Sequence, residues 1–475
     1  MLFNSYEFLV LFLPITLLIY YLPCFRKYQL YILILAGFVF YAFNHLEFLC
    51  LLICSALLNA VSSYLTQVTV DIKMRKIYAL TGVVLNLCLL GFFKYGTLVY
   101  HSFFEINQFG EWLVTLPLPI GISFYTFQGI SLLVDVLKNE KNNIIVSEKN
   151  FIKHIVHTIF FISFFPHSIA GPIVKAHTFL PQIAKKSFSD IKFEYVFRIL
   201  VQGYFLKTVI ADNIQDYTFW ITHPYFLEQS SITLVIMMFG FSVQIFADFA
   251  GYSLIAIGVA ALFGYKLPDN FNFPYISQSF SEFWQRWHMS LSAWLKEYLY
   301  IPLGGNRKGK LRTYINLMIV MLLGGMWHGA AWNYLFWGGV HGVALAIERF
   351  YLHSQLGSFI ENKVNKYKVY RFFQSVLVFT VVSWAWLFFK LPNFEHAILY
   401  TKAIFSNIGK DNDISKVLYC LFYSIPIFLY HMKYLLREHW FVKKIKKYEV
   451  IVYAIMLFFI LCNGGNSDAF IYFQF

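Results

Sequence analysis

Long apolar runs recur along the whole chain, and they constrain its fold more than any other feature of the sequence. A helix needs about 20 apolar residues to cross a bilayer, and the runs 232–264 and 314–348 exceed that length. Charged residues make up 13% of the chain, against roughly 25% in soluble proteins. The sequence therefore predicts an all-α polytopic membrane protein with about 11 to 13 membrane-embedded helices, some of them broken or re-entrant.

The apolar pattern continues without an internal repeat or a soluble domain, so residues 1–475 are predicted to form one membrane domain. One stretch, 154–184, carries Pro166, Pro172 and Pro181 among its apolar residues. Proline interrupts helices, and irregular backbone at membrane depth has to be covered by protein. We therefore expect broken or re-entrant helices in this stretch.

Basic residues outnumber acidic ones by 38 to 25, which gives a formal net charge of +13. They gather in short clusters between apolar runs, such as 73–76 and 363–371. Positive loops on the cytoplasmic side fix the orientation of a polytopic protein, so we interpret the basicity as topology and expect no nucleic-acid partner. The six cysteines are scattered without a Cys-x-x-Cys pair, which predicts neither a disulfide framework nor a metal site.

Residues 265–312 are far more polar than the apolar runs on either side of them. Ser279 and Glu282 have the Ser-x-x-Glu spacing of a capping box, so a helix should begin near Phe280. Tryptophans and leucines recur at helical spacing through 284–298, beside a polar face. The pattern predicts one amphipathic helix at the cytoplasmic interface.

A histidine lies in the middle of the apolar run 314–348. Basic residues flank the run, and its simplest fold is a helical hairpin that enters from the cytoplasm and turns near Gly329. The 14 helical steps from Tyr314 to His328 span about 21 Å, which places the imidazole deep in the membrane. An ionisable side chain at that depth is expensive, and this makes His328 a functional candidate.

The residues around His328 favour function over the alternative that it only hydrogen-bonds to a neighbouring helix. Asn333 lies near the turn, and Gly329 has no side chain, which we expect to leave room for a substrate. For His288, a functional role and a solvated interfacial position agree equally well with the sequence. We expect His341 to support the residues of the site from behind or to be a packing residue, and not to be a catalyst.

The chemistry that suits one buried histidine is acyl transfer to a hydroxyl. The pKa of histidine lies near neutrality, so the side chain can take the hydroxyl proton as the oxygen attacks an acyl carbon. A thioester donor needs no metal. The sequence offers no nucleophilic cysteine, carboxylate pair or metal cluster that would favour another chemistry.

Two weaker signals stay open. The basic, glycine-rich loop that contains Asn306 and Arg307 lacks the spacing of a P-loop, and it either sets orientation or holds the phosphates of a nucleotide-like donor. Asp248 lies inside an apolar run. It is either a proton-relay residue or an acid satisfied by Tyr252, Ser253 or a neighbouring helix.

The chain resembles the membrane-bound O-acyltransferase family, in the bacterial branch that includes alginate and peptidoglycan O-acetyltransferases. The resemblance runs nearly end to end. The motifs that carry it are PIGISFYTFQ at 119–128, IAGPI at 169–173, Lys207 with IADN at 210–213, NFNFPY at 270–275, FWQRWHMSLS at 283–292, YIPLGGNR at 300–307 and GMWHGA at 325–330.

The resemblance implies that His328 is the essential membrane histidine and His288 the second characteristic polar position. It implies acetyl-CoA as the donor on the cytoplasmic side, no bound cofactor or metal, and a bacterial inner-membrane location. It also implies a separate extracytoplasmic acetyltransferase as the partner that decorates a polysaccharide. The residues expected to contact donor or acceptor are Tyr125, Gln128, Asp248, Arg286, Asn306, Arg307, Trp327 and Asn333.

One departure keeps a rival open. Alginate-type members have an acid where this chain has Leu254, and the leucine resembles the branch that D-alanylates teichoic acid from a carrier protein. Outside acyl transfer, a transporter for a lipid-linked saccharide would also need many helices and polar residues within the membrane. A non-enzymatic scaffold is the most distant alternative, because it needs no histidine at membrane depth.

Overall fold

The computed structural model describes residues 1–475 except for 44–45, 104–116, 139–149, 169–170, 438–447 and 466–475. The first two residues of the predicted motif 169–173 therefore lie outside the described residues. The described residues form helices and connecting segments, with no strand among them. The predicted all-α fold class is confirmed.

The described chain divides into two compact units. The first unit contains Met1–Leu200 and Ser253–Asp269, and the second contains Val201–Tyr252 and Asn270–Phe475. The prediction of a single membrane domain stays a prediction, and each unit is described by itself.

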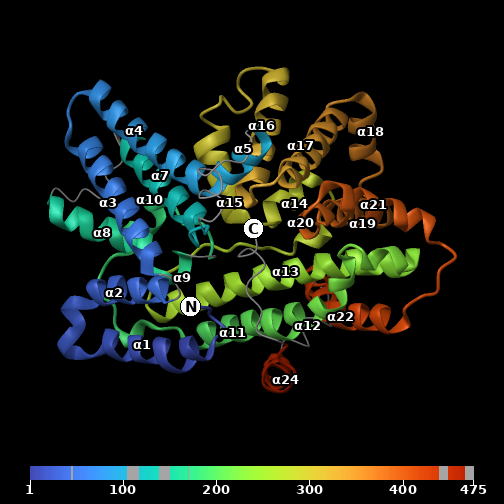
Figure 1. Ribbon diagram of the computed structural model, residues 1–475, viewed down its shortest axis with the longest axis horizontal. Helices are drawn as coiled ribbons and strands as arrows, with labels where there is room; N and C mark the ends of the chain where they lie inside the picture. The colour runs from blue at the N-terminus through green and yellow to red at the C-terminus, as the bar shows by residue number, and fades with distance from the viewer. Residues whose placement is uncertain (44–45, 104–116, 139–149, 169–170, 438–447, 466–475) are drawn as a thin grey trace. The chain divides into compact units, whose positions relative to one another are not determined.

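The first unit is built from helices of very different length, labelled in Figure 1. The four that pack together around its centre are α3 (Leu46–Val68), α4 (Ile72–Leu90), α7 (Ile122–Lys138) and α8 (Phe151–Ser163). The others are α1 (Leu13–Tyr21), α2 (Gln29–Ala42), α5 (Gly96–Phe103), α9 (Phe165–Ser168) and α10 (Ala176–Phe179), and α11 (Phe193–Tyr204) contributes residues to both units.

Local sequence signals explain where two of these helices begin and where one stretch breaks. Asp71 accepts a hydrogen bond from Lys73 N at the start of α4, and Asn150 accepts one from Lys153 N at the start of α8. The stretch 154–184 is divided into α8, α9 and α10. The predicted break in this stretch is confirmed.

The second unit contains the helical hairpin and the segments around it. Its central pair is α16 (Lys310–His328) and α17 (Trp332–Leu352), which lie against each other (Figure 1). The other helices are α12 (Asp212–Thr218), α14 (Phe280–Arg286), α15 (Met289–Leu295), α18 (Gln355–Lys363), α19 (Lys368–Ala385), α20 (Leu387–Lys390), α21 (Phe394–Ser406), α22 (Ile414–Leu435) and α24 (Glu449–Cys462), and α13 (Ser231–Leu262) contributes to both units.

Glycines let the two arms of the hairpin approach closely. A Cβ on Gly325 would overlap the backbone oxygen of Tyr334, and a Cβ on Gly338 would overlap that of Met321. Small residues at the contact between apolar helices allow this kind of backbone approach. The close contact fixes the position of His328, which is the last residue of α16.

Five described helical segments are long and apolar enough to cross a membrane. They are Leu46–Val68, Ile72–Tyr100, Ser231–Leu262, Lys368–Lys390 and Ile414–Leu435, and the pair Glu7–Tyr21 and Pro23–Ala42, bent by 93°, could form a sixth. Other apolar runs are shorter helices, such as α8 and α24. The number of single long spans among the described residues is thus smaller than the 11 to 13 embedded helices predicted, because several apolar runs form short or broken helices.

The predicted amphipathic helix begins at the predicted place but is not continuous. Ser279 accepts a hydrogen bond from Glu282 N, and α14 starts at the next residue, Phe280. The helix ends at Arg286, and His288 adopts a left-handed conformation with φ of 42° before α15 begins. The prediction of one helix through 284–298 was therefore wrong, and the break places His288 at a helix junction.

Candidate functional site

His328 lies at the C-terminal end of α16 in a closed aromatic environment. Its side chain is buried. Its ring centroid lies 5.0 Å from that of Trp327, 5.3 Å from that of Trp337 and 5.2 Å from that of Phe389. The hairpin therefore holds the predicted catalytic imidazole between three aromatic rings.

His288 is the second histidine of this site, and its ring centroid lies 6.2 Å from that of His328. The imidazole is fully buried, and the histidine lies outside the candidate spans. Burial lowers its pKa to about 3, because the charged ring would lose its hydration. The structure thus brings together the two histidines that were predicted from distant parts of the sequence.

Asn270 fixes the orientation of His288. Its Oδ1 lies 2.9 Å from His288 Nδ1 and also accepts a hydrogen bond from Ser290 Oγ. Because an amide oxygen can only accept, Nδ1 must carry the proton and Nε2 must present its lone pair. Nε2 is buried and has no hydrogen-bond partner among the described residues. His288 therefore offers a neutral, unprotonated nitrogen to a ligand.

A second group of buried nitrogens continues from Trp337. The ring centroid of Trp337 lies 4.7 Å from that of His341 and 5.4 Å from that of Trp386, which is 5.0 Å from that of Trp287. All four side chains are fully buried, and their ring nitrogens have no hydrogen-bond partner among the described residues. Buried indole N–H groups usually find an acceptor. The site can therefore receive a ligand that carries several acceptor oxygens.

Two other predicted contact residues on the hairpin have different surroundings. Trp327 is buried and faces both histidines, with its ring centroid 5.9 Å from that of His288. Asn333 donates its amide hydrogens to Leu391 O and Pro392 O, at 2.7 and 3.1 Å. Asn333 thus anchors the chain that follows Phe389, and only its Oδ1 is left for a substrate.

Gly329 does not provide the substrate access that the sequence suggested. A Cβ at this position would overlap the ring of Tyr334. The space beside His328 that the missing side chain leaves is therefore filled by that ring. The expectation of a substrate path over Gly329 was wrong, and the physical reason is close packing between the turn and α17.

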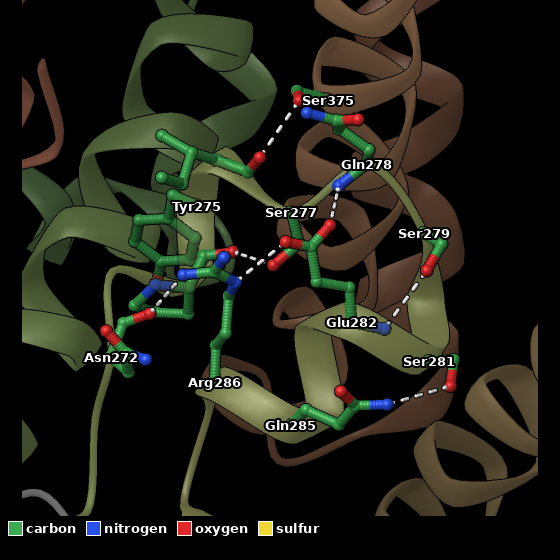
Figure 2. A network of polar contacts seen from close by, with 12 residues as sticks. Asn272, Tyr275, Ser277, Gln278, Ser279, Ser281, Glu282, Gln285, Arg286 and Ser375 are labelled. Atoms are coloured by element: carbon green, nitrogen blue, oxygen red, sulfur yellow. Dashed lines mark hydrogen bonds and ion pairs between the residues drawn. The ribbon is translucent and has the colours of Figure 1, made fainter. Parts of the chain in front are cut away.

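Arg286 belongs to a polar network at the start of the broken helix, shown in Figure 2. Its Nε lies 2.8 Å from Glu282 Oε1, and its guanidinium donates to Asn272 O at 3.0 Å. Its guanidinium also stacks over the ring of Tyr434 at 5.1 Å. These contacts tie the end of α14 to the segment that carries Asn270, so Arg286 helps to hold the His288 junction in place.

Asn306 and Arg307 lie on the surface, in the loop before α16. Asn316 supports this loop by donating a hydrogen bond to Gly305 O at 2.9 Å. Exposed groups on a fixed loop can contact a large soluble ligand. The orientation and phosphate-binding interpretations of this loop both stay open.

Asp248 is paired with a buried lysine that the sequence did not reveal as its partner. Lys207 Nζ lies 2.9 Å from Asp248 Oδ1 and 2.6 Å from Asp212 Oδ1. All three side chains are buried. The structure therefore agrees with the interpretation of Asp248 as an acid satisfied by a neighbouring helical segment, through an ion pair.

Tyr125 and Gln128 belong to the first unit, on α7, whereas both histidines belong to the second. Both side chains are buried, and the amide of Gln128 has no hydrogen-bond partner among the described residues. A contact with a polar ligand would satisfy that amide. The predicted substrate-binding roles of these two residues stay predictions.

Sequence reasoning missed the role of Asn270 and the contacts of Trp337 and Trp386. Asn270 opens the motif NFNFPY at 270–275, but the motif alone does not indicate that its amide reaches a histidine 18 residues later. Trp337 lies nine residues after His328 on the returning arm of the hairpin. That spacing was the available signal, because a hairpin turned near Gly329 brings the two arms together.

Comparison with known proteins gives consistent similarities. Residues 152–389 match the membrane-bound O-acyltransferase family. The chain is 37% identical over 415 residues to the protein named "Probable alginate O-acetylase AlgI" of Pseudomonas aeruginosa, covering 86% of this chain and 75% of that protein. It is 34% identical over 438 residues to the peptidoglycan O-acetyltransferase of Helicobacter pylori, covering 85% and 80%. A shorter similarity, 30% over 243 residues, relates 49% of this chain to 59% of the teichoic acid D-alanyltransferase of Bacillus subtilis.

Proposed function

Because the chain belongs to the membrane-bound O-acyltransferase family, we propose that it moves an acetyl group from cytoplasmic acetyl-CoA across the membrane for O-acetylation of an extracytoplasmic polysaccharide. The observation that carries the proposal is the buried histidine pair, whose ring centroids lie 6.2 Å apart. An acceptor sugar between the two rings could donate one hydroxyl proton to His328 and a second to His288. The relatives that act on alginate and peptidoglycan support a polysaccharide as the final acceptor.

His328 is the general base in the proposed reaction. The acceptor oxygen attacks the carbonyl carbon of the thioester, and the hydroxyl proton passes to the imidazole. The carbon–sulfur bond then breaks, and the departing sulfur takes the proton back from His328. The products are an acetyl ester and free CoA. This sequence uses the near-neutral pKa of histidine and requires neither a metal nor a covalent enzyme intermediate.

His288 positions the acceptor in this scheme. Its Nε2 lone pair, fixed by the hydrogen bond from Nδ1 to Asn270, accepts a hydrogen bond from a second hydroxyl of the acceptor, because the proton of the attacking hydroxyl goes to His328. The indole N–H groups of Trp337 and Trp386 are suitable donors for carbonyl oxygens of the donor. Asn306 and Arg307, exposed on their loop, provide contacts for the phosphates of CoA.

The remaining parts of the proposal follow from the same assignment. The protein lies in the inner membrane of a bacterium and works with an extracytoplasmic acetyltransferase that completes transfer to the glycan. The described chain has five or six candidate spans, which is consistent with a carrier of acyl groups within the bilayer. D-alanyl transfer is the second candidate, favoured by Leu254 and by the similarity to the teichoic acid enzyme.

The test uses the purified full chain in proteoliposomes. Radiolabelled acetyl-CoA is supplied, and the release of CoA and transfer of label to glycan hydroxyls are measured, with D-alanyl-loaded carrier protein as the alternative donor. We expect turnover of acetyl-CoA that requires His328. Turnover of the carrier thioester alone would establish the second candidate, and turnover of neither donor would favour a transporter.

A deletion strain supplies an independent measurement. Loss of O-acetyl groups from one envelope polysaccharide, restored by the wild-type chain, would support the proposal and identify the acceptor. An unchanged content of O-acetyl esters in all envelope glycans would contradict it.

A further inference from the structure

A cavity in the second unit lies apart from the histidine pair. Its volume is about 1280 Å³, and it runs between α17 and α19. The lining positions on α17 include Phe336, Val340, Val343 and Ile347, whose spacing of three or four residues places them on one face of the helix. Trp337 and His341 are not among the lining residues. One face of α17 therefore contacts the histidine site, and another face lines this cavity.

The cavity walls are apolar and lie beside a candidate membrane span. The residues Lys368–Lys390, which include α19, are long and apolar enough to cross a bilayer. From this segment Leu377, Val378 and Val381 line the cavity opposite α17. A groove formed by such residues beside a span faces hydrocarbon, so acyl chains are the molecules available to fill it.

One end of the cavity differs chemically from its walls. Glu282, Glu348 and Gln374 line this end, and no lysine or arginine occurs among the described lining residues. Gln374 Oε1 is buried without a hydrogen-bond partner among the described residues. Gln278 N donates to the carboxylate of Glu282 at 2.7 Å, in the network shown in Figure 2. Because Glu282 is ion-paired with Arg286 at 2.8 Å, the polar end presents acceptor oxygens and its acidic charge comes from Glu348.

We propose that this groove binds a membrane aminophospholipid. An acyl chain lies along the apolar walls of α17 and α19, and the primary ammonium of the headgroup donates to Gln374 Oε1 and Glu348. A quaternary ammonium carries no N–H to donate to these oxygens. An anionic headgroup would be repelled by the Glu348 carboxylate. The choice of headgroup follows from this charge and acceptor pattern, and it is independent of the acyl group that the histidine site transfers.

The polar end also gives the lipid a mechanical connection to the histidine site. Glu348 accepts hydrogen bonds from Phe280 N and Ser281 N, at 2.5 and 3.2 Å. These residues begin α14, which ends just before His288. A headgroup held at Glu348 therefore contacts the same carboxylate that anchors the segment leading to His288.

The experiment measures which lipids stay bound to the full chain. The protein is reconstituted in nanodiscs containing equal amounts of phosphatidylethanolamine and phosphatidylcholine, then released into detergent, and the retained lipid is identified by native mass spectrometry. We expect phosphatidylethanolamine to be enriched about fivefold, because one favourable headgroup charge contact is worth about 1 kcal/mol. Equal retention of the two lipids, or retention of neither, would overturn the proposal.

Two substitutions locate the binding place. Val343→Trp fills the groove and should remove the retained lipid, whereas Gln374→Leu should keep a bound lipid but reduce its headgroup preference. Val376→Trp is the matched control, because Val376 is exposed to a similar degree, 43% against 47% for Val343, and does not line the groove. Lipid retention that survives Val343→Trp, or that is lost equally in Val376→Trp, would contradict this site. Acetyl-CoA turnover is measured separately, so failure of the lipid site is distinguishable from failure of the proposed function.

Discussion

Two buried polar pairs in this protein have opposite hydrogen-bond arrangements. In the first unit, Asn59 Nδ2 donates to Asn86 Oδ1 at 3.2 Å, and Asn86 Nδ2 donates to Asn59 Oδ1 at 2.9 Å. Each amide also donates to a backbone oxygen of its own helix, Ser55 O or Gly82 O. The asparagine pair is thus satisfied within the protein, and it joins α3 to α4.

In the histidine pair of the second unit, His288 is equally buried but is not satisfied in this way. Asn270 fixes one nitrogen of His288, while Nε2 has no partner among the described residues. The same holds for both ring nitrogens of His341 nearby. Leaving buried polar groups without partners costs about 1–3 kcal/mol each. The asparagines thus hold two helices together, whereas His288 and His341 keep buried nitrogens that a ligand of the proposed reaction would satisfy.

The largest loss of acetyl-transfer rate is expected when His328 is replaced. His328→Ala should reduce acetyl transfer by about 10²–10⁴-fold, the usual contribution of a general base, while the protein still inserts and folds. Initial rates with acetyl-CoA in proteoliposomes measure this change. Asn86→Ala is the contrasting variant, because its rate per folded molecule should stay unchanged. Equal losses of rate per folded molecule in both variants would remove the distinction between the two pairs.

Replacement of His288 should cause the next largest loss of acetyl-transfer rate. His288→Ala removes the acceptor Nε2 and should lower the rate about tenfold, the value of one hydrogen bond of about 1.4 kcal/mol. Asn270→Ala should reproduce part of this loss, because it no longer fixes the tautomer of the ring. A rate that His288→Ala leaves unchanged would return His288 to a packing role.

His288→Ala also tests how the reaction rate depends on pH. Because burial lowers the pKa of His288 to about 3, the ring is protonated only below that pH and stays neutral from pH 5 to 8. The pH–rate profiles of the wild type and of His288→Ala should therefore have the same shape in this range and differ only in height. A change of shape would show that His288 titrates there.

The asparagine pair should affect stability and not chemistry. Asn59→Ala leaves the Asn86 amide buried without its partner, which should lower the free energy of unfolding by about 1–3 kcal/mol. Replacing both residues by leucine should cost less than the sum of the two single changes, because no unpaired group remains. Unfolding by denaturant in detergent micelles measures both. Additive losses would mean that the two amides are not coupled.

Some of this contrast could be predicted from the sequence, and some could not. The apolar run around His328 indicated a buried histidine, which the structure confirms, while its depth in the membrane stays a prediction. The start of α14 follows from the spacing of Ser279 and Glu282. The break at His288 did not follow, because it depends on the hydrogen bond to Asn270, which lies 18 residues earlier in the chain. Tertiary contacts of this kind override a regular helical pattern.

The surroundings of two further residues illustrate the same limit. Gly329 suggested open space, but a ring from α17 fills that space. Asp248 suggested either a relay or a satisfied acid, and its ion pair with Lys207 agrees with the second interpretation, which the sequence alone did not show. A sequence indicates which residues need partners, whereas the identity of the partner depends on packing.

The smallest change in kinetics is expected at the surface, where side chains belong to neither the buried asparagine pair nor the buried histidine pair. Arg307 is exposed on the loop before α16, so an ion pair with a CoA phosphate there is worth at most about 1 kcal/mol. Arg307→Ala should raise the KM for acetyl-CoA no more than about fivefold, leave kcat unchanged, and lose its effect as salt screens the interaction. Asn306→Ala, one residue earlier and without a charge to remove, is the control for the salt dependence. A loss of kcat in Arg307→Ala would mean that this loop acts on the histidine pair itself, and the separation between a buried reaction site and an exposed docking loop would have to be abandoned.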